Sequence, residues 1–160
     1  MIIIHDVKPL PRLVATALAE RLRVMPAVVV TGARQTGKST LAEGLVPGKR
    51  RYRSLDDFDV LDAARRDPEA LLGGSDPVTL DEVQREPGLL PAVKRAIDRN
   101  RVPGRFLLTG SANLLLMRQV SESLAGRASY LTLWPMTRRE QLGLGRAGRW
   151  EELLATREDE

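Results

Sequence analysis

The sequence predicts an α/β fold in which helices cover both faces of a mostly parallel β-sheet, as a three-layer sandwich. Short apolar runs rich in β-branched residues alternate with segments of helical periodicity, which is typical of parallel strands joined by helices. The first of these runs, 27–31, leads into a glycine-containing turn that opens a helix. With 160 residues, of which 42% are hydrophobic and 29% charged, the chain is long enough to bury a core.

Local patterns predict each element in turn. Apolar residues at helical spacing predict an amphipathic helix over 10–22, which Met25 and Pro26 end. Further helices are predicted, in chain order, at 41–45, 56–66, 68–72, 89–99 and 114–120. Strands are predicted at 27–31, 51–55, 78–80, 105–109 and 130–134. Polar and apolar residues alternate over 51–55, which favours an edge position for that strand.

The most specific motif runs from Gly32 to Ser39 and fits the phosphate-binding loop pattern G-x-x-x-x-G-K-[ST] at every fixed position. A strand that turns sharply into a helix directs several backbone N–H groups at one point, where they can hold an anion. Gly32 and Gly37 permit the tight turn and keep Cβ atoms away from the phosphates. Lys38 is expected to reach the β- and γ-phosphates, and the Ser39 hydroxyl to ligate Mg²⁺. The predicted binding residues here are Gly32, Ala33, Arg34, Gln35, Thr36, Gly37, Lys38, Ser39 and Thr40.

A second candidate element is the acidic pair Asp81 and Glu82, which follows the apolar run 78–80. Asp81 is expected to hold the shell of the Mg²⁺ ion, usually through water. Glu82 is expected to polarise the attacking water as a general base, a role that suits hydrolysis. The alternative is that the two carboxylates only cap the following helix. Their position downstream of a phosphate-binding loop favours the functional interpretation.

A third candidate element ends the predicted strand at 105–109, where Thr109 and Ser111 flank a glycine. The carboxyl ends of parallel strands line the ligand crevice of an α/β sheet, so either hydroxyl is placed to bond the γ-phosphate or the attacking water. The alternative is helix capping, because Ser111 and Asn113 are both good N-caps. The sequence does not separate these interpretations, nor Thr109 from Ser111.

Composition excludes several classes of site. The chain has no cysteine, which excludes disulfides and thiolate metal sites, and its single histidine, His5, excludes a multi-histidine metal centre. No apolar stretch approaches the roughly 20 residues that span a bilayer, and the first residues lack the pattern of a signal peptide. We therefore expect a cytoplasmic protein with no membrane partner.

The net charge is +4, and the basic pairs in the sequence have acidic residues nearby. This pattern favours a solvated mixed-charge surface over a nucleic-acid patch. Aromatic residues make up only 4% of the chain, so a base-stacking platform is not expected. DNA association through the arginines is therefore the weaker alternative, and a steep salt dependence of binding would be its signature.

Several motifs in a fixed order resemble those of AAA-type P-loop ATPases of bacteria and archaea. They are GARQTGKST, YRSLDD, TLDEVQR, FLLTGSAN and SLAGR, and the resemblance covers roughly residues 12–140. The resemblance implies the fold of a P-loop NTPase with an AAA-like core. Members of the most similar branch usually carry a further C-terminal domain of unknown function. We therefore expect this chain to be the ATPase core alone, as a single domain over 1–160, with an N-terminal amphipathic helix region (1–25), a nucleotide-binding core (26–136) and a C-terminal helical tail (137–160).

The resemblance also implies roles for individual residues. Lys38 and Ser39 bind phosphate and Mg²⁺, Asp81 is the Walker B aspartate and Glu82 is the catalytic base. The segment with Thr109 and Ser111 takes the sensor position. Arg127, in the SLAGR motif, matches a family arginine that acts near the γ-phosphate of its own chain or in the site of a neighbouring subunit.

The leading functional hypothesis is Mg²⁺-dependent hydrolysis of ATP, with Lys38, Glu82 and Arg127 as the catalytic residues. Adenine is favoured over guanine because no N-K-x-D motif occurs. A second hypothesis is a nucleotide-binding switch or interaction module with little turnover. A small-molecule kinase is a third, which the Asp81–Glu82 pair disfavours. The expected partners are ATP or ADP, with a homo-oligomer or a protein partner left open.

Overall fold

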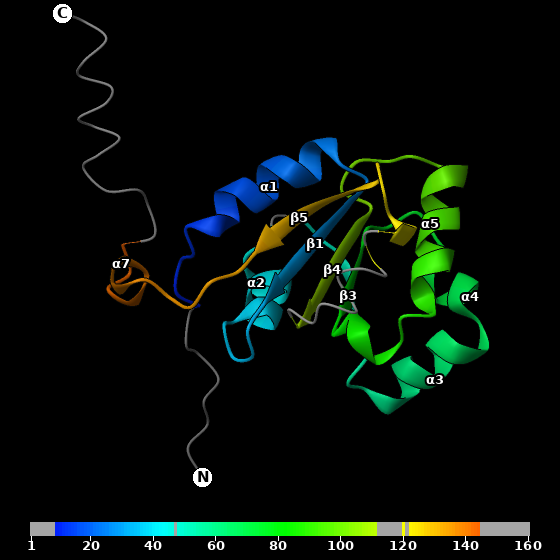
Figure 1. Cartoon of the computed structure of the whole chain (residues 1–160), viewed down its shortest axis with the longest axis horizontal. Helices are drawn as coiled ribbons and strands as arrows, with labels where there is room; N and C mark the ends of the chain where they lie inside the picture. Colours follow the sequence, from blue (N-terminus) through cyan, green and yellow to red (C-terminus); the bar gives the residue numbers. More distant parts are fainter. Residues whose placement is uncertain (1–8, 47, 112–119, 121, 145–160) are drawn as a thin grey trace, which may run out of the picture.

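The computed structural model describes residues 9–46, 48–111, 120 and 122–144 of the chain. Its five strands form one sheet in the order β2-β3-β4-β1-β5, and every pairing between neighbours is parallel (Figure 1). The strands are β1 (Ala27–Gly32), β2 (Arg51–Ser54), β3 (Val78–Asp81), β4 (Phe106–Ser111) and β5 (Ala128–Thr132). The predicted parallel α/β fold is confirmed, and β2 is the edge strand that its alternating pattern predicts.

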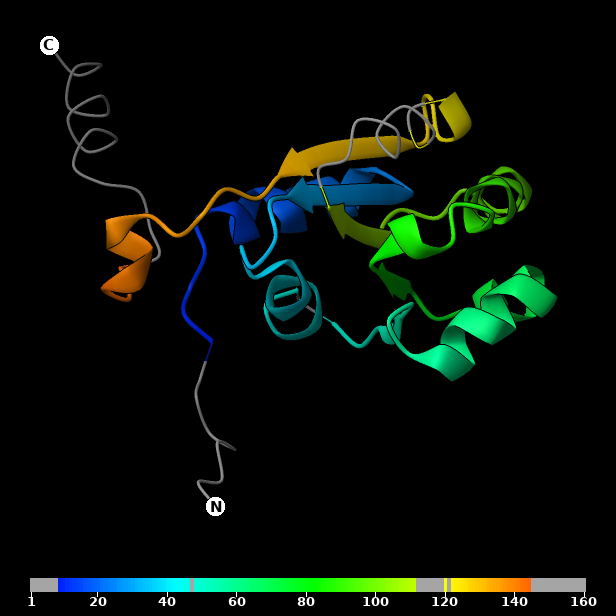
Figure 2. The same cartoon turned by 60° about the horizontal axis from the view of Figure 1, so that its bottom comes forward.

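Helices cover both faces of the sheet and make the three predicted layers (Figure 2). The helical elements are α1 (Val14–Val24), α2 (Lys38–Gly44), α3 (Phe58–Arg66), α4 (Pro68–Leu72), the 3₁₀ turn η1 (Val83–Arg85), α5 (Leu89–Arg99) and α7 (Arg138–Gln141). Because side chains alternate along a strand, Val28 and Val30 of β1 pack with α1 and α2 on one face. Val29 points to the other face, where the core contains residues of α3, α4 and α5.

Local chemistry accounts for the element boundaries that differ from the prediction. The helix predicted from residue 56 begins at Phe58, because the Asp57 side chain caps it by accepting the Asp59 N–H at 2.9 Å. The last strand lies two residues earlier than predicted, at Ala128–Thr132. The helix predicted at 114–120 lies outside the described residues except for Val120, as does most of the predicted C-terminal tail.

Strand order decides where the candidate motifs meet. β4 lies between β1, which carries the phosphate-binding loop, and β3, which carries the acidic pair. Since all five strands are parallel, their carboxyl ends meet at one edge of the sheet, which we call the carboxyl edge, and their amino ends at the opposite amino edge. In the described part of the chain, no helix combines the length and apolar character needed to cross a lipid bilayer.

Candidate functional site at the carboxyl edge

The loop between β1 and α2 has the backbone shape of an anion cradle. Gln35 has a φ of 60° and Gly37 a φ of 87°. These two left-handed residues flank Thr36, so the backbone conformation alternates along the loop. Such an alternation turns successive N–H groups toward a common concave face. The Thr36 hydroxyl closes the turn by donating to the Ala33 carbonyl at 3.0 Å. The loop therefore has the nest geometry that its sequence predicts.

Lys38, the first residue of α2, bends its side chain back over this loop. Its Nζ donates to the Ala33 carbonyl at 2.8 Å and to the Gly32 carbonyl at 3.3 Å, and the residue is only 5% exposed. The ammonium group is thus held at the loop by neutral carbonyls, and no carboxylate is among its hydrogen-bond partners in the described chain. A cation held in this way keeps its charge available to an anion in the cradle.

The structure gives a packing reason for glycine at position 32. A Cβ atom at this position would lie far inside van der Waals contact of the Leu133 carbonyl oxygen, which belongs to the segment after β5. The glycine therefore allows the neighbouring backbone to approach β1 closely. Gly37 is needed for its positive φ, as the sequence predicts.

Asp81 ends β3 and is buried, 3% exposed. Its Oδ2 accepts the Tyr52 hydroxyl at 2.6 Å, and its Oδ1 accepts the Thr109 hydroxyl. Burial raises the pKa of Tyr52, and the carboxylate of Asp81 raises it further, while a hydrogen bond with the Ser39 hydroxyl opposes the shift. Tyr52 therefore stays protonated as a donor to Asp81.

Glu82 follows directly and has a φ of 58°, which turns the chain sharply out of the strand. Its backbone N–H points to the Thr109 hydroxyl at 3.3 Å, and its carboxylate accepts the side-chain amide of Gln84. The carbonyl of the same Gln84 amide accepts the Ser111 backbone N–H at 3.2 Å. Gln84 thus ties the Glu82 carboxylate to the end of β4, with both ends of its amide satisfied.

Several of these residues line one cleft of about 510 Å³, which we call the carboxyl-edge cleft. This volume lies within the roughly 300–1,000 Å³ of small-ligand sites. The cleft is lined by Arg34, Gln35, Lys38, Asp56, Glu82, Gln84, Arg85 and Ser111. The structure therefore brings Lys38 and Glu82 together across an open space. Of the two hydroxyls that the sequence left equal, Ser111 lines the cleft, whereas Thr109 is fully buried beneath it.

The donor set fits a magnesium ion that is shared with a ligand. Among the residues that the structure describes, no three His, Cys, Asp or Glu side chains gather into a metal-binding group. Ser39 and Asp81 supply one hydroxyl and one carboxylate. Mg²⁺ commonly takes one or two protein carboxylates and completes its octahedron with water and phosphate oxygens. Thr40 lies away from the cleft and lines a small separate cavity beside Leu41.

Arg127 is not brought to this site within the chain. It stands directly before β5 and therefore lies at the amino edge, where its carbonyl accepts the N–H of Ala27. Its guanidinium donates to both carboxylate oxygens of Asp98, at 2.6 and 3.0 Å. This pairing raises the pKa of Arg127 and lowers the pKa of Asp98. The expectation that Arg127 acts near the γ-phosphate of its own chain is therefore not met, because β5 separates it from the loop by its whole length.

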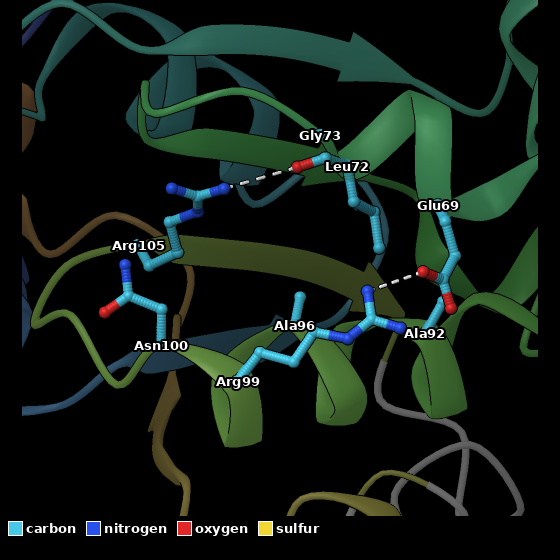
Figure 3. A pocket seen from close by; sticks show the side chains of 8 residues that line it. All are labelled: Glu69, Leu72, Gly73, Ala92, Ala96, Arg99, Asn100 and Arg105. Atoms are coloured by element: carbon cyan, nitrogen blue, oxygen red, sulfur yellow. Dashed lines mark hydrogen bonds and ion pairs between the residues drawn. The ribbon is translucent and has the colours of Figure 1, made fainter.

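The amino edge has a smaller cavity of its own, which we call the amino-edge cavity (Figure 3). It measures about 190 Å³ and is lined by Glu69, Leu72, Gly73, Ala92, Ala96, Arg99, Asn100 and Arg105. Its charged groups are already engaged: Arg99 donates to Glu69 at 2.6 Å, and Arg105 donates to carbonyls of the loop before β3. This arrangement leaves no reactive pair comparable with Lys38 and Glu82.

Comparison with known proteins agrees with this geometry. A family model described as an AAA domain matches residues 25–142, from the end of α1 through α7. The chain belongs to this AAA domain family, the AAA-type P-loop ATPases. The match includes the phosphate-binding loop, the acidic pair and the end of β4.

Two curated relatives of the AAA domain are 41% identical to it over 128 residues. They are the uncharacterized proteins Mb2031c of Mycobacterium bovis and Rv2008c of Mycobacterium tuberculosis. The alignment covers 79% of this chain and 29% of each relative. The chain thus spans less than a third of the length of these relatives.

Sequence reasoning missed three residues that shape the site. Tyr52 and Gln84 lie within motifs that it did single out, YRSLDD and TLDEVQR, but their roles depend on partners that only the strand order supplies. Arg12 precedes α1 and donates to the carbonyl of Thr36 in the phosphate-binding loop at 2.7 Å. A lone arginine at the start of an amphipathic helix gives no signal of such a contact.

Proposed function

We propose that this AAA domain binds ATP together with Mg²⁺ in the carboxyl-edge cleft and hydrolyses it to ADP and phosphate. The observation that carries the proposal is the pair formed across the cleft by Lys38, on the phosphate-binding loop, and Glu82, at the end of β3. Family membership supports nucleotide binding, and the cleft chemistry supports hydrolysis by water.

In this proposal, different residues bind the phosphates and the Mg²⁺ ion. Backbone N–H groups from Ala33 to Ser39 and the ammonium of Lys38 hold the phosphates, and Arg34 and Gln35 border them at the loop tip. Bound Mg²⁺ neutralises the charge of the β- and γ-phosphate oxygens. The Ser39 hydroxyl and the Asp81 carboxylate hold that ion, and Tyr52 and Thr109 fix the carboxylate in place.

The proposed chemistry rests on Glu82, which accepts a proton from the attacking water. Gln84 orients the Glu82 carboxylate and leaves the Ser111 hydroxyl at the cleft wall, within reach of a γ-phosphate. Because Arg127 lies at the amino edge, this proposal gives it a role only in the site of a neighbouring subunit.

Isothermal titration with ATP and Mg²⁺ tests the binding step. The wild-type chain binds ATP, and Lys38→Ala weakens binding by about 100-fold, because a charge-assisted contact to each of two phosphates is lost. Lys94→Ala is the matched control, because Lys94 is exposed on α5. Unchanged affinity in Lys38→Ala, or equal losses in both variants, would contradict the assigned cleft.

A further inference from the structure

Arg12 joins three distant parts of the chain. It is 5% exposed, and its guanidinium donates from Nη1 to the Thr36 carbonyl at 2.7 Å, from Nη2 to the Trp134 carbonyl at 2.8 Å and from Nε to Glu140 Oε1 at 3.1 Å. These partners belong to the phosphate-binding loop, the segment after β5 and α7 respectively. Arg12 itself precedes the residues 25–142 that the family model matches.

Glu140 is equally well held. It is 3% exposed, and its carboxylate accepts the backbone N–H of Leu13 at 2.8 Å and of Thr137 at 2.7 Å, besides Arg12. Burial alone would raise the pKa of Glu140, but these hydrogen bonds and the charge of Arg12 outweigh it and lower the pKa. A buried ion pair keeps its geometry when its remaining donors and acceptors are also satisfied, as they are here.

The contact with Thr36 controls the orientation of one peptide unit in the cradle. The C=O and N–H of a trans peptide point in opposite directions, and no cis peptide bond occurs in the described chain. When Arg12 holds the Thr36 carbonyl on its own side, the N–H of Gly37 is turned to the other side. A flip of this unit would exchange an N–H donor for a carbonyl oxygen, which repels phosphate. Arg12 Nη1 also packs against Gly37, where it would lie 3.3 Å from an added Cβ.

We infer that Arg12 is a positioning residue for the phosphate-binding loop, and that Glu140 and the segment after β5 set its place. This inference rests on the proposed function, because the loop amides matter only if they bind a polyphosphate. Its consequence is that nucleotide affinity depends on α7 and the segment that leads to it, 128 residues away from Arg12 along the chain.

Arg12→Lys separates positioning from charge, because lysine keeps the cation but cannot hold three acceptors in a planar fork. We expect the dissociation constants for ATP and for inorganic triphosphate both to rise about tenfold, since one loop amide is no longer fixed. Arg21→Lys is the matched control: Arg21 also donates to a backbone carbonyl, that of Tyr130, but far from the loop. Circular dichroism verifies that each variant is folded at the titration temperature, so the affinity reports the loop and not unfolding.

Glu140→Gln is the second variant, and it keeps the inference testable if Arg12→Lys fails to fold. It should weaken ATP binding by about threefold to tenfold, and the double variant should lose no more than Arg12→Lys alone, because the pair acts as a unit. Unchanged ATP affinity in the folded variants, or an equal loss in Arg21→Lys, overturns the positioning role. A wild-type chain that binds neither ATP nor triphosphate overturns the proposed function first, and this inference with it.

Discussion

The two edges of the sheet use polar residues in opposite ways. At the carboxyl edge, Lys38 and Glu82 face an open cleft, where Gln84 donates a hydrogen bond to Glu82. Tyr52 donates to the neighbouring carboxylate of Asp81. At the amino edge there are several arginines, but their side chains bond to groups of the fold itself. Arg50 donates to the Thr79 hydroxyl and to the carbonyls of Val78 and Gly104, and Arg127 pairs with Asp98.

This difference teaches that charge alone does not indicate a site. Burial lowers the pKa of Arg50 to about 10, but its donors hold the carbonyls of Val78 and Gly104, where the chain enters β3 and β4. The side chains of the carboxyl edge are fewer, but they converge on a space large enough for a ligand. Variants at the amino edge should therefore change stability, and variants at the carboxyl edge should change ligand binding or turnover.

The largest effect on stability is expected at Arg50. Arg50→Met leaves the Gly104 and Val78 carbonyls without their donor and should lower the free energy of unfolding by about 2–4 kcal/mol. ATP affinity of the folded variant should stay within about twofold of wild type. Urea unfolding and titration measure the two quantities, and Arg65→Met, which breaks an exposed ion pair with Glu86, is the control. An Arg50→Met variant that keeps its stability but binds ATP more weakly would contradict the distinction between the two edges.

At the carboxyl edge, Gln84→Ala should change the rate of turnover rather than the stability of the fold. It removes the amide that ties the Glu82 carboxylate to Ser111, so the rate of phosphate release should fall about tenfold, about 1.4 kcal/mol in the barrier. ATP affinity should change less than about threefold, because the phosphate contacts are made elsewhere. Asn100→Ala, which removes an exposed carboxamide at the amino edge, is the control. An equal fall in affinity and rate would mean that Gln84 shapes binding rather than the base.

The pH dependence of stability tests the role of Glu140, a buried group that contributes to the stability of the fold and holds Arg12 beside the phosphate-binding loop. Its pKa is lowered in the folded chain, so its contribution to stability is present above the pKa of an unfolded glutamate, about 4.3. That contribution is lost as the pH falls through the lower folded pKa. Between pH 7 and pH 3, wild type should therefore lose more unfolding free energy than Glu140→Gln, measured by urea unfolding. Parallel pH curves for the two chains would contradict the assigned hydrogen bonds.

The smallest effect is expected at Arg127. Because Arg127 lies at the amino edge and pairs with Asp98, Arg127→Ala should leave the turnover of dilute, monomeric protein within about twofold of wild type. Phosphate release measured over a range of protein concentrations, with native mass recorded alongside, tests this. Turnover that rises with wild-type oligomer and is lost in Arg127→Ala would support a place for the arginine in a neighbouring subunit's site. A large loss of turnover in the monomeric Arg127→Ala variant would contradict its position at the amino edge.

Local pattern predicted the parts of the site that one short segment builds. The phosphate-binding loop, the acidic pair at the end of β3 and the small residues at the end of β4 each follow from a run of a few residues and from the rule that parallel strands end at one edge. The edge position of β2 followed from its alternating pattern in the same way.

The remaining features depend on partners distant in sequence. Thr109 reaches Asp81 because β4 lies beside β3, and periodicity carries no information on strand order. Arg127 resembled a catalytic arginine by motif, but its partner Asp98 lies 29 residues away on α5. Arg12 contacts Glu140 across 128 residues. In each case the residue type is ordinary, and only the fold decides what it contacts.

The most direct test of the account is multiple-turnover phosphate release by wild type and Glu82→Gln, with ATP binding measured on the same preparations and Lys38→Ala as the control for contaminating activity. The account predicts that wild type releases many phosphates per chain, whereas Glu82→Gln binds ATP within about threefold of wild type but turns over at least about 100-fold more slowly. Glu82→Gln that hydrolyses ATP at the wild-type rate would contradict the role of Glu82. Wild type that binds ATP tightly and releases no phosphate would make the cleft a nucleotide-binding module rather than an ATPase.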